Sequence, residues 1–107
     1  MYHEAALTEA TYYILLSLYE PRHGYGIMQE TERLSGGRVR LAAGTLYGAL
    51  GAMCEKDWIR LLPGEDGGRR KDYVLTEQGL RVLLHEIDRL RELVRNGEAV
   101  LEGKSDG

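Results

Sequence analysis

The fold is decided by residues 43–75, which read AGTLYGALGAMCEKDWIRLLPGEDGGRRKDYVL. The first part predicts a helix over Ala43–Lys56, because apolar residues recur there at the spacing of one helix face: Leu46, Leu50 and Met53. Two runs of bulky residues follow, Trp58–Leu62 and Lys71–Leu75, and a loop rich in glycine separates them. The stretch therefore predicts a helix followed by a β-hairpin.

The face of this helix opposite the leucines is small and uncharged, apart from one tyrosine. It consists of Gly44, Tyr47, Gly48 and Gly51. Each glycine inside a helix costs about 1 kcal/mol relative to alanine. We therefore interpret this slim face as a surface that another molecule approaches closely.

Two shorter helices are expected before this stretch. The first begins at Thr8, a suitable N-cap, and stops at Glu20–Pro21, because a residue before proline avoids the helical conformation. The second runs over Gly24–Leu34 and ends at Gly36–Gly37, since glycine adopts the left-handed conformation beyond a helix C-terminus.

A long helix capped by Thr76 is expected after the hairpin. Its apolar residues have coiled-coil spacing, and we call them the seam: Leu80, Leu83, Ile87, Leu90 and Val94. The pattern continues through Gly97 to Leu101, and over that length it is about 30 Å long. Burial against the chain's own core is one interpretation, but pairing with a second copy covers this length more economically. Glu86 and Arg89 are expected to pair on an exposed side of the helix.

The order helix, helix, helix, strand, strand, helix is typical of a winged helix-turn-helix. The predicted fold class is mainly α with a small β-hairpin wing, followed by a long C-terminal dimerisation helix. We expect the winged helix-turn-helix domain over residues 5–75 and the dimerisation helix over residues 76–102. Residues 103–107 contain no apolar residue and are expected to form a disordered tail.

Composition narrows the function. The 107 residues suffice for one domain, and the net charge of −3 hides a basic middle third, where residues 38–71 carry seven Lys and Arg against four acids. The sequence has a single cysteine, Cys54, and shows neither a leader nor an apolar run long enough to span a membrane. These features fit a cytoplasmic protein. The three histidines share no metal-ligand spacing, so we expect no metal. The sequence suggests no Ser–His–acid arrangement and no phosphate-binding loop, so we expect no cofactor and no enzymatic activity.

DNA binding is the leading functional hypothesis. In a winged helix-turn-helix the third helix enters the major groove and the wing lies along the backbone or in the minor groove. Helix N-termini and wing cations suit phosphates. The residues expected at DNA are Arg38, Arg40, Ala43, Gly44, Thr45, Tyr47, Gly48, Arg69, Arg70 and Lys71. Two alternatives stay open: wing cations that only keep a sheet edge soluble, and a protein-interaction module whose wing docks an acidic partner.

Four motifs resemble the PadR family of transcriptional regulators. They are Thr8–Leu18, His23–Ile27, Ala43–Leu50 and Gly67–Gly79, and the likeness extends over about residues 5–102. The resemblance implies a homodimer built by the C-terminal helix. It also implies a transcriptional repressor, bound to a palindromic operator and released from DNA by a small-molecule effector, often aromatic.

Three positions depart from the family pattern. The family often has Ser-Pro where this chain has Ala42–Ala43, so the third helix is expected to lack a side-chain cap. Asp57 replaces a glycine, and aspartate tolerates the left-handed conformation that this turn needs. Leu90 lies nearest to the position at which some relatives carry a drug-stacking tryptophan, so the resemblance does not extend to such a pocket.

Overall fold

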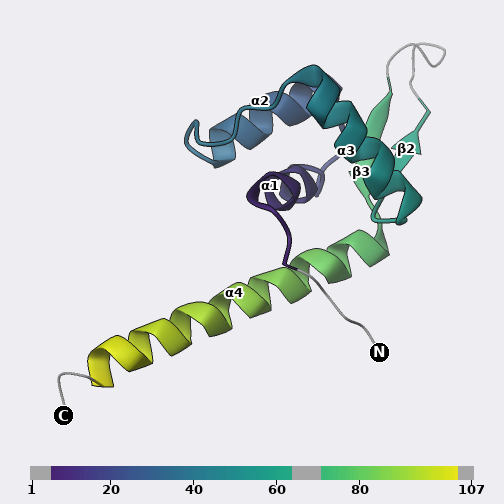
Figure 1. The fold of residues 1–107 in the computed structure, drawn as a ribbon. Coiled ribbons are helices and arrows are strands. Elements are labelled where there is room, and N and C mark those ends of the chain that lie inside the picture. Colours follow the sequence, from purple (N-terminus) through teal and green to yellow (C-terminus); the bar gives the residue numbers. More distant parts are fainter. Residues whose placement is uncertain (1–5, 64–70, 104–107) are drawn as a thin grey trace.

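A computed structural model describes residues 6–63 and 71–103 of the chain. It confirms the predicted fold class, with a mainly helical chain, a small antiparallel sheet and a long C-terminal helix (Figure 1). The elements are α1 Glu9–Ser17, β1 Arg22–His23, α2 Gly24–Leu34, α3 Ala43–Glu55, β2 Ile59–Leu62, β3 Asp72–Leu75 and α4 Glu77–Gly103. The tail predicted from residue 103 is corrected, because Gly103 is still helical; residues 104–107 lie outside the described part.

The helix starts follow the local sequence. Thr8 caps α1 by accepting a hydrogen bond from the Thr11 N–H at 3.1 Å. The Nδ1 atom of His23 caps α2 by accepting from the Gly26 N–H at 3.2 Å. As expected from Ala42, α3 has no side-chain cap, and its first N–H groups stay open to an external acceptor.

The sheet has three strands, in the order β1-β3-β2, and all pairings are antiparallel. The predicted two-stranded hairpin is therefore incomplete, because β1 adds to the free edge of β3 through the pairing of Arg22 with Tyr73. A two-residue strand has no alternation of apolar and polar residues, so no sequence pattern marked it. The wing tip, residues 64–70, lies outside the described residues.

A single core joins all the helices. It contains Ile14, Leu15, Leu18, Ile27, Leu46, Leu50, Met53, Ile59, Val82 and Leu83. α1 supplies its centre, with α2 on one side and α4 on the other (Figure 1). Burying one such aliphatic side chain contributes roughly 1.5–3 kcal/mol. The core therefore fixes the position of α3 relative to α1.

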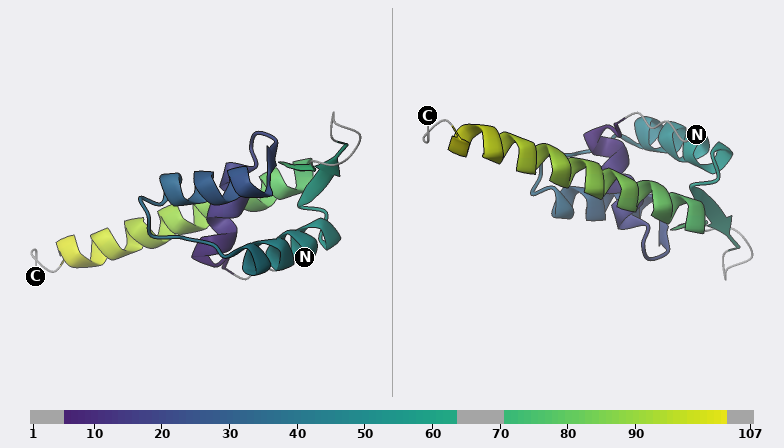
Figure 2. Two further views of the ribbon diagram at one scale, coloured as in Figure 1. Left: turned by 90° about the horizontal axis from the view of Figure 1, so that it is seen from above. Right: turned by 90° about the horizontal axis from the view of Figure 1, so that it is seen from below.

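Among the described residues, only the N-terminal part of α4 lies against the other elements. It packs on α1 and β3, and its distal half projects beyond the other elements (Figure 1 and Figure 2). Leu83 is 3% exposed in the chain's own core, and Leu80 and Ile87 are partly buried. The prediction that Leu83 pairs with a second copy is therefore wrong, because the domain itself covers this residue, and pairing through the other seam residues stays a prediction.

Glu86 is a buried charge on α4, with an exposure of only 5%. Its carboxylate accepts two hydrogen bonds from the Arg89 guanidinium, at 2.8 and 2.7 Å. Those bonds, with a further one from the Leu7 backbone, hold the pKa of Glu86 below its ordinary value although burial opposes the shift. The expectation of an exposed pair is thus corrected: Glu86 ties α4 to the segment that precedes α1.

Candidate functional site

The face of α3 that points away from the core is open. Ala43, Thr45 and the glycines Gly44, Gly48 and Gly51 are all exposed. A Cβ atom added at any of these three glycines would meet nothing within 4 Å. The chain's own packing therefore gives no reason for glycine there, although each costs helix stability.

Tyr47 lies on the same side of α3 and is 51% exposed. Its hydroxyl rests against the buried Gly24 at the start of α2, where an added Cβ would overlap the phenol oxygen. Glycine is needed at this position because the ring crosses the beginning of α2. The contact places a hydroxyl where the N-terminal parts of α2 and α3 meet.

The expected cations lie at the edges of this face. Arg38 and Arg40, in the segment between α2 and α3, pair with Glu9 at 2.9 Å and Glu32 at 3.5 Å. Exposed pairs of this kind are worth less than about 1 kcal/mol, so both guanidiniums could exchange a carboxylate for a phosphate at little cost. Lys71 is exposed beside β3.

The two wing arginines expected at DNA, Arg69 and Arg70, lie outside the described residues. The structure therefore brings together the α3 residues and Tyr47, places Arg38 and Arg40 at their border, and does not describe the tip of the wing.

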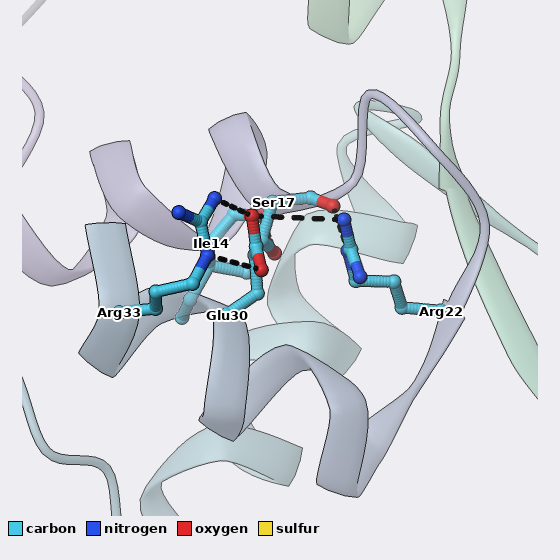
Figure 3. Close-up of polar contacts among 5 residues, drawn as sticks. All are labelled: Ile14, Ser17, Arg22, Glu30 and Arg33. Atoms are coloured by element: carbon cyan, nitrogen blue, oxygen red, sulfur yellow. Dashed lines mark hydrogen bonds and ion pairs between the residues drawn. The ribbon is translucent and has the colours of Figure 1, made fainter.

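Figure 3 shows an ion-pair cluster that joins α1, β1 and α2. It was not predicted from the sequence. Glu30 bonds to Arg33 at 2.6 Å and lies 3.7 Å from Arg22, whose Nε donates to the Ser17 carbonyl at 2.7 Å. The Arg33 hydrogen bond lowers the pKa of Glu30 below its ordinary value. The i,i+3 spacing of Glu30 and Arg33 on a predicted helix could have indicated this ion pair from the sequence. The cluster connects the end of α1, β1 and the second half of α2.

The distal half of α4 carries an apolar surface that the chain leaves uncovered. We call it the distal stripe, and it consists of Leu90, Leu93, Val94, Val100 and Leu101. Beside it, between α1 and α4, lies an apolar groove of about 360 Å³ lined by Tyr12, Ile87, Leu90, Arg91, Val94 and Arg95. Within the stripe, Leu90, Val94 and Leu101 continue the helix face on which Leu83 and Ile87 pack against the core farther up α4.

Other site chemistries find little support within the described ranges. No group of three or more His, Cys, Asp or Glu residues there could hold a metal ion. None of the helices described is both long enough and apolar enough to cross a membrane. Burial raises the pKa of the Cys54 thiol above its ordinary value, which favours the protonated, unreactive form.

Comparison with known proteins agrees with this architecture. The model of the transcriptional regulator PadR-like family matches residues 14–85. A PadR family regulator from Clostridium difficile is 26% identical, with a TM-score of 0.73, over 88% of this chain and 99% of that one. A PadR family regulator from Eggerthella lenta is also 26% identical, with a TM-score of 0.61, over 85% and 79%.

RosR from H. salinarum, at 22% identity and a TM-score of 0.67 over 94% of both chains, supports the fold alone. No curated protein matches the chain. The family model extends over most of the chain and includes the core, α3 and the start of α4. The chain therefore belongs to the PadR-like family of transcriptional regulators.

Proposed function

We propose that the protein binds double-stranded operator DNA through α3 and the wing, as a homodimer on a palindromic site, and acts as a repressor. The observation that carries the proposal is the open face of α3. Gly44, Gly48 and Gly51 face free space, and no described residue of the chain lies close enough to explain them. A helix without side chains on one face can lie deep in a major groove.

The surroundings of this face supply contacts to the DNA backbone. The uncapped start of α3 presents N–H groups that suit a phosphate. The Tyr47 hydroxyl and the exposed guanidiniums of Arg38 and Arg40 lie at its border. Phosphate contacts of this kind fix the position of a protein on the duplex, while the groove face of the helix reads the bases.

Pairing through the distal stripe would supply the second half of the site. Leu90 and Val94 lie on the face of α4 that is buried farther up the helix, and they lose their cover where the domain ends. A second copy is the occupant that fits a face of this length and composition. An apolar effector that entered the groove beside Tyr12 would contact Leu90 and Val94 and so alter the pairing.

Replacing Gly48 by glutamine is expected to change stability and DNA affinity in opposite directions. Glutamine favours the helix and meets no neighbour, so the free energy of unfolding should rise by about 0.5 kcal/mol. The side chain would fill the space that DNA needs, so the dissociation constant for operator DNA should rise about tenfold or more, equivalent to one base contact. Urea titration and fluorescence anisotropy measure the two effects.

The matched control for this change is Gly103→Gln, which adds the same side chain in free space at the far end of α4. Its DNA affinity should equal that of the wild type. Unchanged affinity in the Gly48→Gln protein would contradict the assignment of the α3 face to DNA.

The wing cations are expected to dominate the salt dependence of binding. Each phosphate contact contributes about 0.9 to the slope of log affinity against log salt concentration. The double variant Arg69→Ala with Arg70→Ala should therefore lower that slope by about 1.8. Arg81→Ala, an exposed arginine on α4, is the control and should leave the slope unchanged. Salt-independent binding, or none to any genomic fragment, would instead favour a protein-interaction module.

A further inference from the structure

The first turn of α4 is fastened directly to the turn that ends α3. The Thr76 hydroxyl accepts a hydrogen bond from the Gly79 N–H at 3.0 Å and so caps α4. The same hydroxyl donates to the Asp57 carbonyl at 2.6 Å. The Thr76 backbone N–H donates to the Trp58 carbonyl at 3.0 Å. One residue thus connects the start of one helix to the end of another.

The α3 side of this connection is itself held firmly. Asp57 adopts the left-handed conformation, with φ of 63°. Its N–H donates to the Cys54 carbonyl at 3.0 Å, and the Trp58 N–H donates to the Met53 carbonyl at 3.0 Å. These bonds close the last turn of α3. A displacement of the turn would therefore displace the end of α3 with it.

α4 has further attachments, both at this turn, where Gly79 lies close to the Trp58 carbonyl, and farther along the helix. It packs on α1 and β3, and Glu86 joins it to the backbone of Leu7. The Thr76 hydroxyl is the side chain that connects α4 to the turn after α3, while Glu86 connects α4 to the start of α1. Two separated attachments define the direction of a rod, so weakening the one at the turn lets α4 tilt more freely about the other.

We infer that Thr76 is a positioning residue, whose two-way hydroxyl sets the angle between α4 and α3 and thereby the separation of the two α3 helices in the dimer. The inference rests on the proposed function. The distal stripe begins at Leu90, about 21 Å along α4 from Thr76. A tilt of about 10° over that length moves the stripe by roughly 3.6 Å, close to the rise of one base pair.

Three substitutions separate the two roles of the hydroxyl. Thr76→Ser keeps both hydrogen bonds. Thr76→Asp keeps a good capping acceptor for the Gly79 N–H but has no proton to donate to the Asp57 carbonyl. Thr76→Ala loses both. A positioning role predicts that the Asp and Ala variants behave alike, whereas a purely capping role predicts that the Asp variant behaves like the wild type.

The first measurement uses operators whose half-site separation is changed by one base pair in either direction. Wild type and Thr76→Ser should prefer one separation by about tenfold, and the Asp and Ala variants should bind all three within about threefold. A merely structural role would weaken binding to all three operators by one common factor. That outcome, or an unchanged preference in Thr76→Asp, would overturn the inference.

The second measurement needs no DNA. Spin labels at Ala52→Cys on α3 and Glu92→Cys on α4, in a Cys54→Ala background diluted into unlabelled protein, report the distance between the helices within one chain. The distance distribution should be narrow in the wild type and Thr76→Ser and broad in the Asp and Ala variants; equal widths would contradict the inference. If the distance distributions differ as expected but the wild type binds no DNA, the proposed function fails, while the role of Thr76 in fixing the angle between α3 and α4 stands.

Discussion

Gly79→Ala is expected to lower the free energy of unfolding by about 3 kcal/mol, the upper end of the usual cost of overpacking. The added Cβ would overlap the Trp58 carbonyl oxygen and come within 2.9 Å of the Leu75 side chain. The carbonyl cannot retreat, because it already accepts the Thr76 N–H at 3.0 Å and belongs to the backbone. A helix gains about 1 kcal/mol from glycine to alanine, which is too little to offset the overlap.

Urea denaturation at one fixed protein concentration checks this prediction, since the stability of a dimer depends on concentration. Gly51→Ala is the matched control, because it makes the same change inside a helix where nothing lies within 4 Å. The control should gain roughly 0.5–1 kcal/mol. Equal midpoints for the two variants would show that α4 does not touch the Trp58 carbonyl.

The double variant Leu90→Asp with Val94→Asp is expected to abolish the dimer and leave each subunit folded. Val94 is 57% exposed in the single chain and Leu90 is also exposed, so neither is needed for the core. A dimer would bury four such side chains, worth at least about 6 kcal/mol in total. The dimer dissociation constant should therefore rise by about four orders of magnitude.

Light scattering measures the mass, and circular dichroism checks the fold. Leu84→Asp is the control, since Leu84 is exposed on a different face of α4 and should leave the mass unchanged. Leu83 is unsuitable for this experiment, because an aspartate in the core would unfold the domain. A double variant that keeps the dimer mass would refute pairing through the distal stripe.

Helix ends and turns were predicted well, because the sequence signals for them lie within a few residues of each other. The bounds of α2 were predicted correctly, since Gly24 and Leu34 are flanked by the Pro21 turn and the Gly36–Gly37 pair, which has positive φ angles. The left-handed Asp57 and the uncapped start of α3 were also predicted and are confirmed. Caps, turns and helical periodicity depend on residues a few positions apart, so they can be recognised in the sequence itself.

How much of the apolar face of α4 is buried by the domain could not be predicted in the same way. Periodicity identified the apolar face on which Leu83 and Leu90 lie, but it could not tell that the domain buries Leu83 and leaves Leu90 exposed. Glu86 was placed on the surface for the same reason, because its charge and its i,i+3 partner are common in exposed helices. Its carboxylate also accepts a hydrogen bond from the Leu7 backbone, almost eighty positions earlier in the chain.

The order of the four helices and the two hairpin strands, the slim face of α3 and the apolar stripe of α4 were thus determined by the sequence alone, because each arises from spacing along one segment. Tertiary packing decided the pairing of β1 with β3 and the length of the apolar stripe that stays uncovered. It also decided the contact between the Tyr47 hydroxyl and Gly24 and the hydrogen bond from the Thr76 hydroxyl to the Asp57 carbonyl. Those features join residues that lie far apart in the chain. Their free energy appears only when the core has brought the segments together, and no local pattern records it.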